Sequence, residues 1–239
     1  MTKIELSSEI TVKLVRSCAS DDSVVQAAQV SAKGENTPHT VPERLIEALM
    51  KGRHGSPFEH NMFTFYVEAP IFVFREWHRH RIASINEWSG RYSEMLPKFY
   101  VPDVDRKVVN RGTKMKPIFG DPEDDETTSK ELYYNALYYG FENNSHDSWS
   151  RYQTMLDHNV APEVARMVLP VNTYSKMYWT VNARSLMNFL SLRVESDASL
   201  VRSYPQKEIE MGADQIELFF ARAMPITHGM FIKNGRVAP

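Results

Sequence analysis

The chain has 239 residues, of which 42% are hydrophobic and 24% are charged, and 28 Lys and Arg residues nearly balance 30 Asp and Glu. This composition excludes disordered, collagenous and coiled-coil chains, and a net charge of −2 provides no general attraction for nucleic acid or anionic membranes. The one cysteine, Cys18, excludes an internal disulfide and a multi-cysteine metal site, and points to a reducing compartment.

Neither a leader nor a membrane span is visible in the sequence. The amino terminus lacks the apolar core of a signal peptide, and no later segment approaches the roughly 20 apolar residues that cross a bilayer. We therefore expect a soluble, cytoplasmic protein.

The amino-terminal part of the chain predicts a strand and a helix. Apolar residues alternate with polar ones at 10–14, which indicates a strand with one buried face. Cys18 lies at the end of this strand and is expected in the core. Ser20 precedes two aspartates, a good start for a helix that should end near Gly34.

A second helix and a second strand follow. Thr40 begins a capping box, and Gly52 ends the helix that this box starts. Residues 52–60 are rich in Gly and Pro and predict a loop. The strand expected at 61–68 presents alternate side chains to opposite faces.

The middle of the chain predicts a helix and then irregular structure. Pro70 fits the first position of a helix over 70–81. An irregular stretch should reach about Pro102, with a short strand around 107–110. The acidic run at 122–126 is interpreted as a solvated loop and helix start.

Two helices are expected next. A long one, from about 132 to 156, is weakened at Gly140 and carries aromatic residues that are expected in the core. A short helix between Pro162 and Pro170 carries Arg166.

The last part of the chain adds a strand and two helices. The strand is expected at 174–181, Asn182 caps a helix over 183–193, and a last helix runs from about 206 to 223. Strands and helices follow no regular βα alternation, which favours an α+β fold. No break in composition divides the chain, so we expect a single compact domain over residues 1–239.

The strongest chemical signal lies between residues 75 and 91. This segment contains no lysine but four arginines, namely Arg75, Arg79, Arg81 and Arg91. Guanidinium groups bind phosphate in a bidentate manner, so this choice of arginine points to oriented anion binding. On a continuous helix Glu76, Arg79 and His80 would share one face, with Arg81 on another. A solvated helix with an internal ion pair explains any one of these residues, but not the cluster.

Ser89 and Gly90 give a second indication of phosphate binding. Gly90 permits close approach of the backbone, and Ser89 with neighbouring amides can hold phosphate oxygens. The alternative is Ser89 as a nucleophile, but nothing near it in sequence resembles a Ser-His-Asp arrangement. Neither a glycine-rich nucleotide motif nor HExxH occurs, and no metal site is expected.

Residues 79–92, RHRIASINEWSGRY, resemble the signature of the flavin-dependent thymidylate synthases, which is Arg-His-Arg, seven residues, then Ser-x-Arg. Every specified position is met. The resemblance extends to 54–60, 165–170 and 179–193, and so covers most of the chain in the expected order. It implies a fold like that of the thymidylate synthase complementing proteins, an antiparallel sheet with flanking helices.

The resemblance also implies an activity. This is methylation of dUMP to dTMP, with 5,10-methylenetetrahydrofolate as carbon donor, FAD as hydride carrier and NADPH as reductant. Uracil C5 is a poor nucleophile until negative charge develops on the ring, and an arginine beside a carbonyl oxygen stabilises that charge. Arg193 matches the family's catalytic arginine.

The site residues are carried over by position. The implied FAD contacts are Ser56, Arg79, His80, Arg81, Glu87, Asn182, Arg184 and Asn188. The implied dUMP contacts are Glu76, Trp77, His78, Arg79, Glu87, Trp88, Ser89, Gly90, Arg91, Arg166 and Arg193. Asn182 can also be explained as a helix cap.

A homotetramer is implied as well. A chain of 239 residues has little room for FAD, dUMP, folate and NADPH, so we expect active sites that are shared between subunits. The lone cysteine is consistent with chemistry that needs no thiolate nucleophile.

Two positions depart from the family pattern. Glu76 stands where the family often has Gln, and its carboxylate is expected to modulate phosphate affinity rather than supply it. After Arg193 the family commonly has a Ser-His pair, which is absent here. The segment that follows looks longer than usual, Pro205 should break any helix there, and one flavin or folate contact is left unmatched.

Two other functions remain open. A phosphate- or nucleic-acid-binding module would use the arginines, with Trp77, Trp88 and Tyr92 stacking on bases, but the net charge of −2 disfavours it. A flavoprotein acting on another nucleotide or on RNA uridine ranks last, because no basic surface for RNA is visible. We therefore expect neither a nucleic-acid nor a membrane partner.

Overall fold

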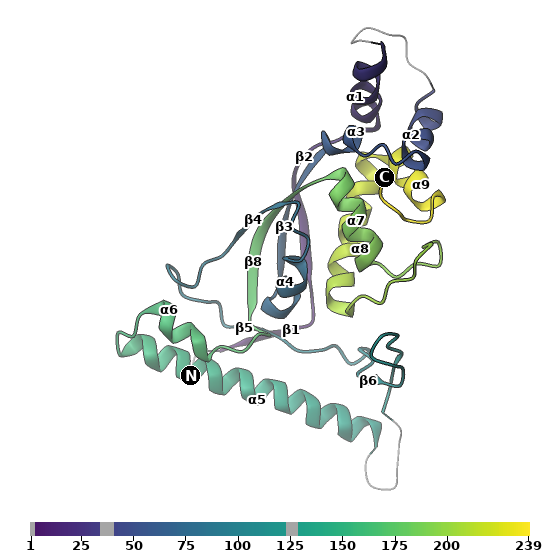
Figure 1. The fold of residues 1–239 in the computed structure, drawn as a ribbon. Coiled ribbons are helices and arrows are strands. Elements are labelled where there is room, and N and C mark those ends of the chain that lie inside the picture. The colour runs from purple at the N-terminus through teal and green to yellow at the C-terminus, as the bar shows by residue number, and fades with distance from the viewer. Residues whose placement is uncertain (1–2, 34–40, 123–128) are drawn as a thin grey trace. The chain divides into compact units, whose positions relative to one another are not determined.

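The computed structural model describes residues 3–33, 41–122 and 129–239, shown as a coloured ribbon in Figure 1. The chain groups into two compact units. Unit 1 consists of Met1–Glu9, Ala69–Phe74 and Trp88–Ser175, and unit 2 of Ile10–Glu68, Arg75–Glu87 and Lys176–Pro239. Each unit is described by itself below.

Unit 2 is built on a four-stranded sheet with the order β2-β3-β8-β4. Strand β2 pairs antiparallel with β3, and β4 pairs antiparallel with β8. The strands are β2 (Thr11–Cys18), β3 (Met62–Pro70), β8 (Tyr174–Asn182) and β4 (Ser84–Glu87), of which the last two residues of β3 and the first two of β8 belong to unit 1.

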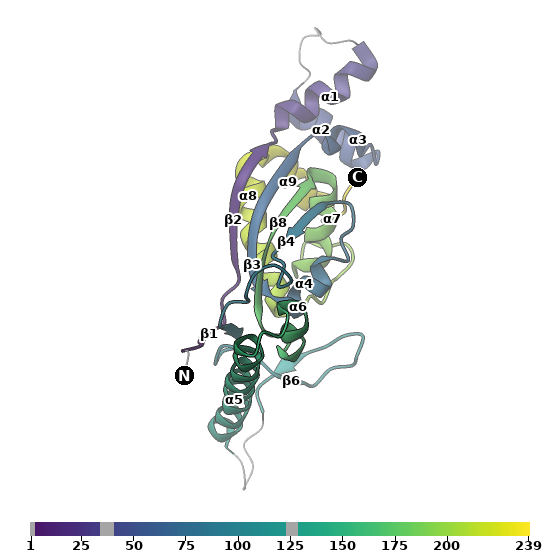
Figure 2. The same ribbon diagram turned by 90° about the vertical axis from the view of Figure 1, so that its left-hand side faces the viewer.

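Helices cover one face of this sheet, where Figures 1 and 2 show α7 and α8. Strand β3 alternates as the sequence predicts, and Phe63, Phe65 and Val67 are fully buried. The Phe63 ring meets that of Phe220 in α8 edge-on, with centroids 6.1 Å apart. The helices of the unit are α1 (Asp21–Lys33), α2 (Pro42–Lys51), α3 (Ser56–Glu59), α7 (Ala183–Arg193), α8 (Lys207–Ala223) and α9 (Pro225–Lys233).

Four aromatic rings form the centre of unit 2. Trp179 of β8 lies between Phe65, Trp77 and Phe189, with ring centroids 6.0, 5.4 and 4.9 Å away. Trp77 and Phe189 also contact each other, at 4.9 Å. This cluster fixes the start of the arginine-rich segment and the helix that carries Arg193 against the same sheet.

Unit 1 contains a long helix and short strands. Ile4, Phe99, Trp149, Tyr152 and Ala165 form its core. Strand β1 pairs parallel with β5, and β6 pairs antiparallel with β7. The elements are β1 (Glu5–Ser7), β5 (Lys98–Tyr100), β6 (Val109–Asn110), β7 (Phe119–Gly120), α5 (Lys130–Asp157), α6 (Pro162–Ala165) and a 3-10 turn η1 (Arg166–Val168). Helix α4 (Ile71–Trp77) begins in unit 1 and ends in unit 2.

The predicted α+β class with an antiparallel sheet is confirmed. The strands and helices expected at 10–14, 61–68, 174–181, 183–193 and 206–223 are present within a few residues. A single domain over residues 1–239 stays a prediction, because the structure groups the chain into two units. Gly34, Thr40 and residues 123–126 lie outside the described residues.

The helix predicted over 70–81 is too long. Pro70 closes β3, and α4 ends at Trp77. The next amides bond three residues back, Arg79 N to Glu76 O at 3.1 Å and His80 N to Trp77 O at 3.0 Å. The fully buried Trp77 ends the helix by packing on the sheet, so Arg79 and His80 lie in a turn and the helix-face argument for them is wrong.

Shorter elements were also misassigned. Residues 52–60 contain α3, because Pro57 is preset for a first helical turn and Phe58 is fully buried. Strands β4 and β5 lie in the stretch predicted as irregular, and α9 follows the helix predicted as the last. None of these carries an apolar alternation long enough to predict it.

Two burial predictions were wrong, one of them in part. Cys18 is exposed because β2 is an edge strand whose register shifts between Leu14 and Arg16. In helix α5, which continues through Gly140, the core prediction is confirmed for Trp149 and Tyr152, but Tyr133, Tyr138 and Tyr139 in its first half are exposed. The periodicity of an isolated helix does not reveal which turns meet a core.

Candidate active site

Arg193 is held by two other residues of the predicted site. It is the last residue of α7, and its Nη1 donates to Glu76 Oε2 at 2.9 Å while its Nε donates to His80 Nε2 at 3.1 Å. The side chain of Arg193 is 19% exposed and that of Glu76 35% exposed. Three predicted site residues therefore meet through direct bonds in unit 2.

His80 has an unusual electrostatic environment. Burial, and secondarily the positive charge of Arg193, lower the pKa of His80 to about 4. Its ring meets Phe189 edge-on, with centroids 4.8 Å apart. At neutral pH the imidazole is uncharged, as an acceptor for Arg193 must be.

Arg79 and Arg81 present their charge to solvent. Both side chains are exposed, and neither forms an ion pair or a side-chain hydrogen bond within the described part of the chain. Between them in sequence, His80 points inward to Arg193. Two guanidinium groups without an acidic partner are suited to an anion with several oxygens, such as a pyrophosphate.

Arg184 is held at a second point of unit 2. Its Nη1 donates to Glu59 Oε1 at 2.6 Å, and its Nε donates to the carbonyl oxygen of Pro239 at 2.7 Å. The guanidinium group lies directly against Gly55, where an added Cβ would be 2.6 Å from Cζ. Ser56 is exposed at the first turn of α3 beside this contact.

The two predicted asparagines differ in their roles. Asn182 Oδ1 accepts from Ser185 N at 2.8 Å, so Asn182 caps α7 as predicted. Asn188 is exposed, and its Nδ2 donates to Arg184 O at 3.3 Å. Asn188 and Arg184 are neighbours on one face of α7.

The remaining predicted site residues of unit 2 lie before β4 or at its end. His78 Nε2 lies 3.6 Å from Glu87 Oε2, and both side chains are partly exposed. Trp77 is fully buried among aromatic rings, so no part of this residue is exposed to a ligand, and its substrate contact stays a prediction.

Unit 1 holds Trp88, Ser89, Gly90, Arg91 and Arg166. Arg91 Nε donates to Glu163 Oε2 at 2.9 Å, and both side chains are about half exposed. A Cβ on Gly90 would lie 3.1 Å from Arg166 Cδ, so Arg166 packs over this glycine. Ser89 Oγ accepts from Arg91 N at 3.3 Å, and Trp88 is half-buried.

Comparison with known proteins shows which family the chain resembles over its length. The family described as thymidylate synthase complementing protein matches residues 13–226. The flavin-dependent thymidylate synthase of Streptomyces coelicolor is 52% identical over 246 residues, covering 99% of this chain and 96% of the relative. That of Tropheryma whipplei is 50% identical over 237 residues, covering 97% and 96%.

The chain belongs to the flavin-dependent thymidylate synthase family. It is therefore an enzyme of nucleotide methylation that uses a flavin. A solved structure with the same fold is the UMP/dUMP methylase PolB of Streptomyces cacaoi, bound with 5-Br UMP. It has a TM-score of 0.89 and 44% identity, and the match covers 99% of each chain.

Some bonding partners of the predicted site residues cannot be found from the sequence. Glu59, which holds Arg184, lies in the 54–60 stretch that carries the family resemblance, yet nothing in its spacing indicates a bond across 125 positions. Glu163, the partner of Arg91, stands at the start of the short helix after Pro162, and nothing in the sequence singles it out as that partner. Each bond forms because folding brings together two residues that are far apart in sequence.

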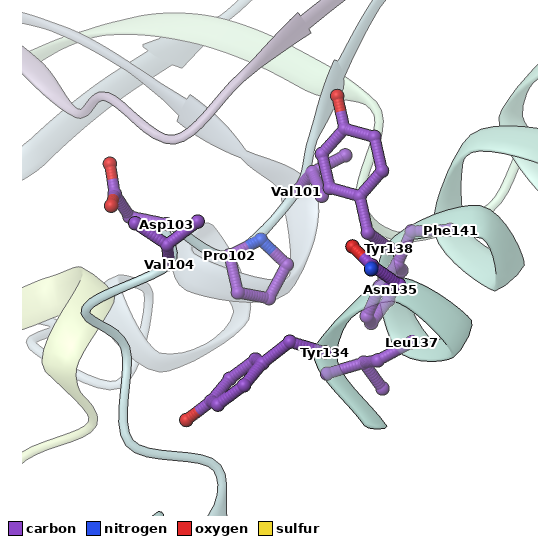
Figure 3. Close-up of a pocket in the computed structure, with 9 residues that line it drawn as sticks. All are labelled: Val101, Pro102, Asp103, Val104, Tyr134, Asn135, Leu137, Tyr138 and Phe141. Carbon is purple, nitrogen blue, oxygen red and sulfur yellow. The ribbon is translucent and has the colours of Figure 1, made fainter. Parts of the chain in front are cut away.

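One pocket of unit 1 is lined by none of the predicted site residues. Figure 3 shows side chains of α5, among them Tyr134 and Tyr138, facing the segment from Val101 to Val104. Its cavity volume is about 80 Å³, well below the roughly 300–1,000 Å³ of small-molecule sites. It contains no residue of the family signature.

Among the described residues, the structure has no helix long and apolar enough to cross a membrane. Within the same residues, no group of three or more His, Cys, Asp or Glu side chains is arranged to hold a metal ion.

Proposed function

We propose that this enzyme converts dUMP to dTMP, with 5,10-methylenetetrahydrofolate as carbon donor, FAD as hydride carrier and NADPH as reductant. The observation that carries the proposal is Arg193, held by Glu76 and His80 of the signature segment. In the reaction a bond forms between uracil C5 and the methylene carbon, and the C5 proton leaves. The bonds from this carbon to folate nitrogen break, so that tetrahydrofolate is released, and a hydride that originates from NADPH completes the methyl group.

Arg193 is the proposed catalytic residue. Negative charge must develop on the uracil ring before C5 attacks carbon, and a fixed guanidinium beside a carbonyl oxygen stabilises that charge. The bonds to Glu76 and His80 keep this group in place before substrate arrives, which lowers the reorganisation that the reaction requires.

We assign the dUMP phosphate and sugar to the other arginines and to the serine-glycine turn. These contacts are Trp77, His78, Arg79, Glu87, Trp88, Ser89, Gly90, Arg91 and Arg166, and Glu76 takes part in the site through its bond to Arg193. The bond between Arg91 and Glu163 is no obstacle, because exposed ion pairs contribute only about 0–1 kcal/mol, and a phosphate offers a charge-assisted bidentate contact.

The residues present fit a flavin dinucleotide. Arg79 and Arg81 supply exposed positive charge for a pyrophosphate, and Ser56, Glu87, Asn182, Arg184 and Asn188 supply donors and acceptors for the rest of the group, with His80 completing the set. When bound, FAD supplies hydride chemistry that no side chain has.

We further propose a cytoplasmic homotetramer with active sites that are shared between subunits, binding dUMP, folate and NADPH but neither nucleic acid nor membrane. Large apolar side chains exposed on α5, such as Leu132 and Tyr139, support an assembly that covers them.

The first test is an absorption spectrum of the purified protein. We expect a yellow protein whose flavin is bleached by NADPH and which releases the uracil C5 proton only when folate is supplied. A protein that does not bind FAD would refute the proposal.

The Arg193→Ala variant tests the catalytic role. We expect retained FAD and a loss of kcat of about 100-fold or more, the size expected for removing a donor to a developing anion. Arg202→Ala is the control, because Arg202 is exposed and its contacts are with its close neighbours Glu195 and Tyr204. Unimpaired turnover of Arg193→Ala would remove Arg193 from the mechanism.

A second substrate, UMP, is favoured by one observation, namely that PolB is a UMP/dUMP methylase. Comparing turnover on dUMP, UMP and RNA separates these possibilities. Affinity for single-stranded oligonucleotides that exceeds affinity for dUMP and falls steeply with salt would instead favour a nucleic-acid module.

A further inference from the structure

The guanidinium group of Arg193 is bonded on two of its edges by one short segment. Glu76, in the last turn of α4, accepts from Nη1 at 2.9 Å, and His80, four residues later, accepts from Nε at 3.1 Å. No other side-chain bond of Arg193 occurs within the residues that the structure describes. The outer edge, with Nη2, remains available to a ligand.

This geometry determines the protonation of His80. Arginine has five N–H donors and no acceptor, so a bond from Nε requires a lone pair on His80 Nε2 and places the ring proton on Nδ1. The buried ring beside a permanent cation favours the same neutral form, and the pKa of His80 falls to about 4. Histidine here acts as an acceptor.

Glu76 adds charge to the same contact. Its carboxylate compensates the charge of a guanidinium that is only 19% exposed, where an unpaired charge would be costly. Because Arg193 is planar, two acceptors on adjacent edges fix both its position and the direction of its remaining N–H groups.

We propose that Glu76 and His80 are positioning residues that act through Arg193, aiming its outer N–H groups at the pyrimidine, and that the Glu76 carboxylate thereby serves turnover more than substrate affinity. This inference rests on the proposed function. It gives the Glu76 carboxylate a partner inside the protein, namely Arg193. Glu76 stands where Gln is common in the family.

The first test reads the ring nitrogens of His80 directly in the wild-type holoenzyme. Histidine labelled with ¹⁵N in the ring gives signals for the eight histidines, and His80→Gln identifies the one from His80. At pH 7 we expect a protonated Nδ1 and an unprotonated Nε2. A proton on Nε2 would overturn the proposal, whatever the activity.

The second test separates turnover from binding. Glu76→Ala should lower kcat about 10- to 100-fold, the loss expected when a reacting group is misplaced by about 1 Å. The Kd for dUMP, measured by calorimetry, should change much less than kcat. Glu76→Gln should recover most of the loss, since its amide oxygen can still accept from Nη1.

Glu195→Gln is the matched control, because Glu195 follows α7 closely, is exposed, and pairs with Arg202. Its kcat and Kd should equal those of the wild type. Unchanged kcat with a raised Kd in Glu76→Ala would make Glu76 a direct substrate contact and refute the proposal, as would Glu76→Gln no better than Glu76→Ala.

Failure of the proposed function is distinguishable from these outcomes. A wild-type protein that binds FAD but makes no dTMP contradicts the function. The ring nitrogens of His80 still decide whether Arg193 is held as described.

Discussion

At the scale of single residues, arginines of one short signature have different roles that depend on their partners. Arg79 and Arg81 are exposed, and we propose that their charge binds a ligand. Arg91 pairs with an exposed glutamate that a phosphate can displace. Arg193, from another part of the chain, is fixed by two acceptors. The sequence predicts anion binding for the arginines of the signature and a catalytic role for Arg193, but only the structure shows which of these side chains are exposed and which are held by partners.

Gly55→Ala should weaken flavin binding without unfolding the protein. The backbone of Gly55, at φ −79°, accepts alanine, but the new Cβ would lie 2.6 Å from Arg184 Cζ and displace Arg184 from Glu59 and Pro239. We expect FAD affinity to fall about tenfold, roughly the loss of one hydrogen bond to a charged group. Fluorescence titration of the apoprotein with FAD measures this.

The control for that experiment is Gly229→Ala. Gly229 lies in α9 and a Cβ there would meet nothing within 4 Å, so flavin affinity should stay at the wild-type value while Tm rises slightly. Equal FAD affinity in Gly55→Ala and wild type would show that the bonds of Arg184 are not needed for flavin binding.

At the scale of elements, one carboxylate joins the first and the last helix of unit 2, α1 and α9. Asp21 is the first residue of α1 and is buried. Its Oδ1 accepts from Thr227 N at 2.8 Å and from Thr227 Oγ1 at 2.6 Å, and its Oδ2 accepts from Ile226 N at 2.9 Å. It therefore caps α9, a helix distant in sequence, and places negative charge at the amino ends of both helices.

Asp21→Ala should destabilise unit 2. Three bonds are lost and two amides of α9 are left without an acceptor, so we expect the free energy of unfolding to fall by about 2 kcal/mol. Urea denaturation measures it. Asp22→Ala is the control, because Asp22 shares the first turn of α1 but is exposed, and a loss as large as that of Asp21→Ala would contradict the capping role.

At the scale of the whole molecule, the proposed substrate residues belong to both compact units. Arg79, His80 and Arg193 lie in unit 2, whereas Arg91 and Arg166 lie in unit 1. Since we propose active sites shared between subunits, residues of one site should come from more than one chain.

Mixed oligomers test this sharing. Arg166→Ala and Arg193→Ala should each be nearly inactive alone. When the two variants are co-expressed, some sites combine an intact Arg166 from one chain with an intact Arg193 from another, and activity should return. Light scattering should give about four times the 27.6 kDa of one chain, as a closed homotetramer requires. Mixed oligomers as inactive as either variant would place both arginines in the same chain.

The sequence alone determined the family, the α+β class and most regular elements. These depend on local spacing, such as Arg-His-Arg before Ser-x-Arg, the alternation along β3, and the cap that Asn182 places on α7, all of which are independent of distant contacts. The choice of arginine over lysine likewise indicated oriented anion binding, because guanidinium geometry is a property of the residue.

Tertiary structure decided where the local pattern ends and which partners meet. Packing of Trp77 on Trp179 ended the helix that periodicity extended to Arg81, and the position of β2 at the sheet edge exposed Cys18. Arg193 meets Glu76 and His80 across 117 and 113 positions of sequence. Such contacts arise only when the sheet and its helices are assembled, because their energy comes from burial shared by segments that are far apart in the chain.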